Sequence, residues 1–133
     1  MRYDKINSQA KINLSLHVIK KLKNNYHNIE SLVTFLKLSD DILVRKSSIQ
    51  DHKVLFYGKF AKGINNQNTI TKLLSILDKK NLLSNQKFEI KVKKNIPQQS
   101  GMGGGSMNAA SILMYFIKKK NYQYFQCKSY KNS

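Results

Sequence analysis

The stretch that decides the fold is Pro97-Gln98-Gln99-Ser100-Gly101-Met102-Gly103-Gly104-Gly105-Ser106-Met107-Asn108-Ala109-Ala110. The chain has only six glycines in 133 residues, and four of them lie here, at positions 101, 103, 104 and 105. Glycine lets a ligand approach the backbone closely. A glycine run at the start of a helix leaves backbone N–H groups free, and the helix dipole adds positive charge there. The stretch therefore predicts a binding site for an anion, most often a phosphate.

Two common phosphate-binding patterns do not fit this stretch. The Walker pattern needs a lysine after its last glycine, and no lysine follows Gly105 directly. The dinucleotide pattern that starts at Gly101 needs a third glycine at position 106, where the chain has Ser106. Ser106 could cap the helix or contact a phosphate oxygen. The alternative, a surface loop that binds nothing, leaves the placement of the glycines before a helix without a purpose.

The flanking residues predict an α+β fold. Alternating or β-branched apolar residues indicate strands at 10–18, 29–38, 42–44, 54–57 and 88–92. Turns are expected at 20–28 and 39–41. Apolar residues at helical spacing predict a helix near 69–80, capped by Asn68, and a second helix from Ser106. We expect a mixed sheet packed against these two helices.

The charge of the chain is strongly basic, at +17 from 24 Lys+Arg and 7 Asp+Glu. Such a charge raises the hypothesis of a nucleic-acid-binding protein. Only two of the basic residues are arginines, Arg2 and Arg45, and the lysines are spread along the chain. Lys, Asn, Ile and Tyr also share AT-rich codons, so a coding bias explains much of the excess. We therefore expect nucleic acid not to be the main partner.

Other features exclude several classes of protein. The single cysteine, Cys127, can form neither an internal disulfide nor a cysteine-based zinc site. No apolar run has the roughly 18 residues needed to span a membrane, and no signal peptide opens the chain. The expectation is a cytoplasmic, soluble domain that does not bind a membrane.

The stretch from Pro97 to Ala110 resembles the second motif of the GHMP kinases. Its triple glycine followed by Ser-x-Asn-Ala-Ala is typical of the members that act in non-mevalonate isoprenoid synthesis. Two further segments agree in the expected order: Ala10-Lys11-Ile12-Asn13-Leu14 resembles the opening strand of those members, and Tyr26-His27-Asn28-Ile29-Glu30-Ser31-Leu32 resembles their Gly-Tyr-His segment. The resemblance covers about residues 1–117.

The resemblance implies a fold and a reaction. The fold would be the GHMP-kinase N-terminal domain, of the ribosomal-protein-S5 domain-2 type, over residues 1–117. The reaction would be ATP-dependent phosphorylation of a hydroxyl on a CDP-linked methylerythritol, with Mg²⁺. Lys11 would be catalytic, and the substrate would contact Asn13, Tyr26 and His27. The ATP phosphates would contact Pro97, Gln98, Gln99, Ser100, Gly101, Met102, Gly103, Gly104, Gly105, Ser106 and Met107.

The sequence departs from the family pattern in two respects. Met107 stands where the family has a second serine, and its thioether offers no hydroxyl to phosphate or metal. No acidic residue follows the glycines, so the catalytic aspartate that the family carries in a later segment is absent. We therefore expect an N-terminal kinase fragment that lacks its second domain and is inactive alone, with residues 118–133 as an aberrant or disordered tail.

Two alternatives to that fragment are kept. The first is a nucleotide-binding half that acts with a partner chain, and the second is a small basic nucleic-acid-binding protein. Binding of ATP without turnover would distinguish the first. Tight nucleic-acid binding that falls steeply with salt would distinguish the second.

Overall fold

The computed structural model describes residues 2–21, 27–98 and 104–131 of the chain. Within these ranges the elements are β1 (Asp4–Lys21), β2 (His27–Lys46), β3 (Lys53–Tyr57), α1 (Thr69–Lys79), β4 (Phe88–Lys93) and α2 (Gly104–Lys131). The predicted α+β class is confirmed. In the described part of the chain, no helix is both long and apolar enough to cross a membrane.

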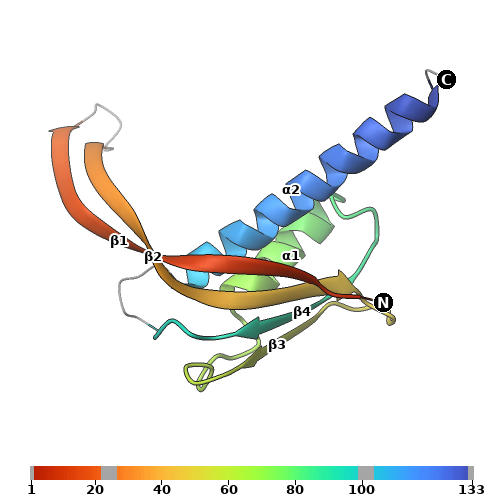
Figure 1. Cartoon of the computed structure of the whole chain (residues 1–133), viewed down its shortest axis with the longest axis horizontal. Coiled ribbons are helices and arrows are strands. Elements are labelled where there is room, and N and C mark those ends of the chain that lie inside the picture. The colour runs from red at the N-terminus through yellow and green to blue at the C-terminus, as the bar shows by residue number, and fades with distance from the viewer. Residues whose placement is uncertain (1, 22–26, 99–103, 132–133) are drawn as a thin grey trace.

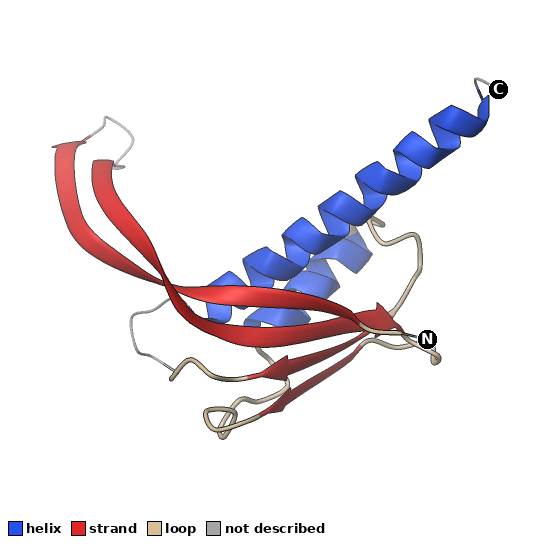
Figure 2. Ribbon diagram, in the orientation of Figure 1, coloured by secondary structure: helices blue, strands red, loops and turns tan. Residues whose placement is uncertain are grey.

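The four strands form one mixed sheet in the order β1-β2-β4-β3. β1 pairs with β2 and β2 with β4 in antiparallel fashion, whereas β3 runs parallel to β4. The parallel pair needs a crossover connection, and α1 provides it. Both helices lie on the same side of the sheet, and the far part of the β1–β2 hairpin extends beyond them (Figures 1 and 2). One face of the sheet is therefore covered by helices.

The hydrophobic core lies between this covered face and the two helices. Every second residue of the central strands points into it, and α1 contributes residues at the spacing of helical turns. Burying this apolar surface is the main driving force that holds the helices on the sheet. The buried side chains of the cluster are Ile42, Val44, Ile70, Leu74, Leu77, Leu83, Phe88, Ile90, Val92 and Ile112.

The turn predicted at 39–41 is wrong, because these residues lie inside β2. The carboxylate of Asp40 is fully buried. It forms an ion pair with Lys94 and accepts hydrogen bonds from the backbone N–H groups of Asn95 and Ile96 at 2.7 and 2.9 Å. These partners replace water around the carboxylate, so an acidic residue can stay within a strand. The two strands predicted on either side of the turn are one continuous strand.

Helix α1 follows its prediction closely. The Asn68 side chain accepts hydrogen bonds from the N–H groups of Ile70 and Thr71 at 3.1 and 3.0 Å. The Thr71 hydroxyl in turn accepts from the Asn68 N–H at 3.1 Å, which completes a capping box. The predicted N-cap is therefore confirmed.

Helix α2 differs from its prediction at both ends. It begins at Gly104 and not at Ser106, and it continues to Lys131. Residues 118–131, expected to be an aberrant or disordered tail, thus lie in the helix. This stretch contains no glycine or proline, and its lysines and glutamines have good helix propensity. Its second half extends away from the sheet (Figure 1). The proposed boundary at residue 117 stays a prediction.

Candidate functional site

A cavity of about 430 Å³ lies where the N-termini of α1 and α2 come together. The first N–H groups of a helix have no partners within the helix, and they carry the positive end of its dipole. Two helix N-termini on one cavity make it suited to an anion. The lining residues on which this interpretation rests are Asn68, Thr69, Lys94, Pro97, Gln98, Gly104, Gly105, Ser106 and Asn108.

The two helix N-termini contribute differently to this cavity. Asn68 already caps two N–H groups of α1. The hydroxyl of Thr69 donates a hydrogen bond to the backbone carbonyl of Gly105 at 3.0 Å. This bond joins the start of α1 to the start of α2 and fixes their spacing. The α2 terminus, which carries the glycines, is therefore the better place for a ligand.

The side chain of Gln98 holds the approach to the glycines in place. Its amide donates hydrogen bonds to the backbone carbonyls of Phe60 and Lys62, at 2.8 and 2.9 Å. Those residues belong to the connection between β3 and α1. The predicted phosphate-binding segment is thus tied to a part of the chain more than thirty residues away. Pro97 and Gln98 both line the cavity, as the sequence predicted for the site.

Lys94 lies at the base of the cavity, and sequence reasoning missed it. Its side chain is only 4% exposed and is paired with the buried Asp40. A Cβ added at Gly104 would lie 3.4 Å from the Lys94 ammonium and 3.3 Å from the Ile96 side chain. Glycine at this position therefore lets the start of α2 approach the ion pair closely. Asp40 lies within β2 and Lys94 directly follows β4, each between polar neighbours, so no local pattern in the sequence indicated the pair.

Asn108 is a second residue that sequence reasoning left out. It lies four residues after Gly104, on the same face of α2. Its side chain is 1% exposed and lines the cavity. Its Oδ1 atom has no hydrogen-bond partner among the described residues. The signal was present, because Asn108 belongs to the motif from Pro97 to Ala110 and has helical spacing from Gly104.

The structure brings only part of the predicted site together. Gly104, Gly105 and Ser106 line the cavity with Pro97 and Gln98. Met107 lines a different space, the groove between α2 and the start of β1, together with Lys5, Ile6 and Asn7. The remaining ATP-site predictions lie at 99–103, outside the described residues.

Three of the four predicted catalytic and substrate residues belong to the paired strands β1 and β2. Lys11 is partly buried in β1 opposite Phe35, and it is not among the described residues that line the cavity. Asn13 pairs with Val33, and His27 begins β2 opposite Lys21. Tyr26 lies outside the described residues. The structure thus places Lys11, Asn13 and His27 on two paired strands, and the roles of all four residues stay predictions.

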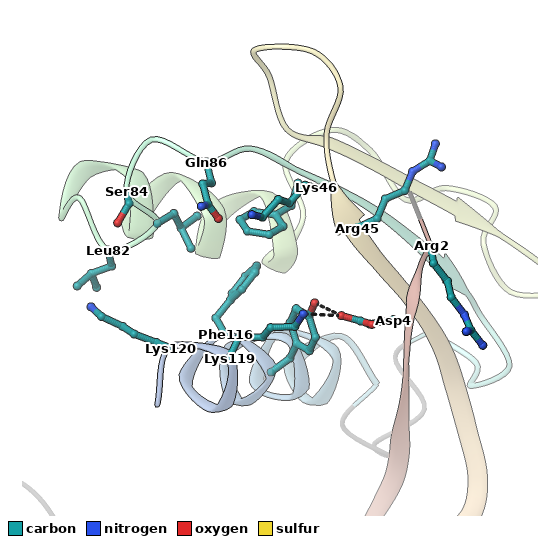
Figure 3. A pocket seen from close by; sticks show the side chains of 13 residues that line it. Arg2, Asp4, Arg45, Lys46, Leu82, Ser84, Gln86, Phe116, Lys119 and Lys120 are labelled. Carbon is teal, nitrogen blue, oxygen red and sulfur yellow. Dashed lines mark hydrogen bonds and ion pairs between the residues drawn. The ribbon is translucent and has the colours of Figure 1, made fainter. Parts of the chain in front are cut away.

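A second cavity, of about 380 Å³, lies near the start of β1 and the middle of α2 (Figure 3). Here the side chains of Asp4, Tyr115 and Lys119 are paired with one another. Asp4 accepts a hydrogen bond from the Tyr115 hydroxyl and pairs with Lys119 at 3.1 Å. These contacts lower the pKa of Asp4, and the hydrogen bond from Tyr115 has the largest effect. The pKa of Tyr115 is raised, mainly by burial of its hydroxyl and to a smaller extent by its hydrogen bond to Asp4.

The basic residues around this second cavity do not converge on one point. Arg2 and Arg45 direct their guanidinium groups away from Lys119 and Lys120 (Figure 3). Arg45 is held by Glu89 in an ion pair of 2.7 Å. This second cavity is similar in size to the first and more basic, but no buried side-chain polar atom among its described lining residues is left without a hydrogen-bond partner.

Comparisons with known proteins agree with the resemblance in the sequence. Residues 68–124 match the family described as the GHMP kinases N terminal domain. The chain is 60% identical to a 4-diphosphocytidyl-2-C-methyl-D-erythritol kinase of Pelagibacter ubique over 87% of its length, and 36% identical to that of Fusobacterium nucleatum over 90%. These alignments cover 41% and 40% of the relatives. The chain thus spans about two-fifths of the length of the curated relatives it matches.

Solved structures give the same result for the fold. A crystal structure of 4-(cytidine 5'-diphospho)-2C-methyl-D-erythritol kinase matches with a TM-score of 0.63 and 26% identity, over 84% of this chain and 39% of that one. A homoserine kinase from Cytophaga hutchinsonii matches with a TM-score of 0.58 and 16% identity, over 84% of this chain and 33% of that one. The second similarity concerns the fold alone.

Proposed function

Because the chain carries the N-terminal domain of the GHMP kinases, we propose that it binds ATP in the cavity between α1 and α2. It would supply the nucleotide-binding part of a kinase that phosphorylates an alcohol group. The observation that carries this proposal is the cavity of about 430 Å³ at two helix N-termini, one of them glycine-rich. Phosphoryl transfer depends mostly on positioning and on electrostatic stabilisation of the phosphates, and a helix N-terminus supplies both.

The proposed substrate is a CDP-linked methylerythritol, as the names of the relatives at 60% and 36% identity indicate. Lys11 would stabilise negative charge on the reacting oxygen or on the transferred phosphoryl group. Asn13, Tyr26 and His27 would contact the substrate. This assignment is supported by the common origin of Lys11, Asn13 and His27 in the paired strands β1 and β2, and by the position of Tyr26 next to His27 in the sequence.

Magnesium would enter the site together with ATP. The described residues contain no group of three or more His, Cys, Asp or Glu side chains able to hold a metal ion. Mg²⁺ in nucleotide sites is commonly bound by substrate phosphates and water with few protein ligands. When bound, the ion would neutralise phosphate charge, while the N–H groups of α2 hold the phosphate oxygens.

A second candidate function is a nucleotide-binding half that needs a partner chain for turnover. All seven acidic residues precede the glycines, at positions 4, 30, 40, 41, 51, 78 and 89. Phosphorylation of an alcohol needs a group to take up the hydroxyl proton, and a carboxylate after the glycines is the group that the family pattern leads us to expect. ATP binding without phosphorylation, and activity on mixing with a separately expressed C-terminal half of a relative, would favour this second candidate.

Calorimetric titration of the purified chain tests the proposal directly. We expect MgATP to bind at least about tenfold more tightly than adenosine, because the contacts lie at the phosphates. Equal affinity for adenosine and MgATP, or no binding of either, would contradict the phosphate site. A parallel assay for phosphorylation of the CDP-linked methylerythritol distinguishes the complete kinase from the nucleotide-binding half.

A further inference from the structure

The buried side chain of Asn108 has no assigned role, although it lies at the centre of the candidate site. It is 1% exposed, and it lines the cavity beside the first turn of α2. Its Oδ1 atom has no hydrogen-bond partner in the part of the chain that the structure describes. Leaving a buried polar atom unpaired costs stability, so native proteins rarely do it without a reason.

The surroundings of Asn108 indicate the kind of ligand that removes this cost. Lys94 and the start of α2, with Gly104 and Ser106, line the same cavity. The ammonium of Lys94 pairs with Asp40, and among the described residues it makes no hydrogen bond to the amide oxygen of Asn108. A ligand that donates a hydrogen bond at this point would pair with Oδ1.

We propose that Asn108 is a ligand-contact residue of the nucleotide site, whose Oδ1 accepts a hydrogen bond from the bound nucleotide or from water on its metal ion. The inference rests on the proposed ATP site and deepens it. It concerns the residue directly after Met107, which the resemblance places against the ATP phosphates. Met107 faces the groove beside β1, whereas Asn108 faces the cavity.

The partner of Oδ1 must carry a hydrogen, because an amide oxygen only accepts. Unprotonated phosphate oxygens therefore do not fit, whereas a ribose hydroxyl or a metal-bound water does. Both groups would donate an O–H hydrogen bond to Oδ1, but only the metal-bound water requires magnesium. Titration with ATP in Mg²⁺ and in EDTA separates them.

The decisive variant is Asn108→Leu, which keeps the size of the side chain and removes its polar atoms. Replacing an unpaired buried polar group by an apolar one of similar shape is neutral or stabilising for the free protein. We expect an unchanged or raised midpoint of urea unfolding together with about tenfold weaker MgATP binding, the loss of one hydrogen bond. A residue with only a structural role would lower the midpoint and leave the affinity unchanged.

The matched control is Asn7→Leu, the same chemical change at an exposed residue beside the groove on the other side of α2. We expect its MgATP affinity to equal that of the unchanged chain. Equal affinity in Asn108→Leu would overturn this inference and leave the ATP site standing. No MgATP binding by the unchanged chain would overturn both. A loss of affinity in Mg²⁺ but not in EDTA assigns the contact to metal-bound water, and a loss in both assigns it to the nucleotide.

Discussion

Two cavities of similar size lie at different places along α2, one of about 430 Å³ at its start and one of about 380 Å³ near its middle. One basic residue, Lys94, lines the first cavity, whereas five line the second. In the second cavity, Asp4, Tyr115 and Lys119 already satisfy one another. In the first, the amide oxygen of Asn108 has no partner in the described ranges, and the helix N-terminus points inward. Unpaired polar groups, more than volume or charge, therefore distinguish a binding site from a surface hollow.

The largest effect is expected from Asp40→Asn, which removes the buried partner of Lys94 beneath the first cavity. An uncompensated buried ammonium costs about 3–5 kcal/mol of unfolding free energy. Urea unfolding measures the loss, and Asp51→Asn, at an exposed position, is the control. Adding Lys94→Met to Asp40→Asn should restore part of the stability, since it removes the unpaired charge. A loss below about 1 kcal/mol in Asp40→Asn would contradict the importance of a buried pair.

A smaller effect is expected from Asn68→Ala, which removes the cap of α1 at the edge of the first cavity. Two hydrogen bonds to backbone N–H groups disappear, and loss of such a cap costs about 1 kcal/mol. Asn66→Ala is the control. In the described residues, the hydrogen bond of Asn66 is accepted by its backbone carbonyl from the Thr71 hydroxyl, so the substitution removes no side-chain bond. Urea unfolding measures the loss of stability. Equal stability of the two variants would show that the start of α1 does not depend on this cap.

The two glycines at the start of α2 should respond differently to alanine. A Cβ at Gly105 would meet only the Thr69 hydroxyl, at an ordinary 3.6 Å, so Gly105→Ala should stabilise the helix by up to about 1 kcal/mol. A Cβ at Gly104 would lie 3.3 Å from Ile96 and 3.4 Å from the Lys94 ammonium, so Gly104→Ala should gain less or lose stability. Thermal unfolding of the pair measures the difference, and identical shifts would refute the close approach at Gly104.

The smallest effect is expected in the second cavity, from Tyr115→Phe. Loss of the hydrogen bond to Asp4, whose side chain is 48% exposed, should cost only about 0.5 kcal/mol at pH 7 and leave ATP affinity unchanged. Because the pKa of Asp4 is lowered in the folded chain, its contribution is present above the unfolded pKa and lost as the pH falls through the folded value. Tyr115→Phe should therefore lose less stability than the unchanged chain between pH 7 and about pH 3. An effect on ATP affinity would remove the distinction between the two cavities.

Much of this arrangement could be predicted from the sequence, because it rests on local patterns. The Asn68 cap, the apolar face of α1 and the glycines before α2 each act within a few residues. The Asp40–Lys94 pair could not be predicted, since it joins residues that are 54 positions apart and that each read as surface residues. Residues 118–131 lack apolar periodicity, yet they lie in α2, because they contain no glycine or proline that would stop a helix.

The candidate site was predicted at the level of the segment but not of each side chain. The glycine stretch predicted an anion site at a helix start, and Gly104, Gly105 and Ser106 line the cavity there. Helical spacing separates Met107 from Asn108 by about 100°, which directs the two side chains to different spaces. The resemblance named Met107, whereas Asn108 is the residue that lines the cavity.

The most direct test of the account is a titration of the ¹⁵N-labelled chain with MgATP, followed by amide chemical shifts. We predict that the largest shifts occur at Asn68, Thr69, Lys94 and Gly104 to Asn108, with little change at Asp4 and Tyr115. Shifts centred on Asp4, Tyr115 and Lys119 would contradict the account, because they would place the nucleotide in the second cavity, where these three side chains are already paired with one another.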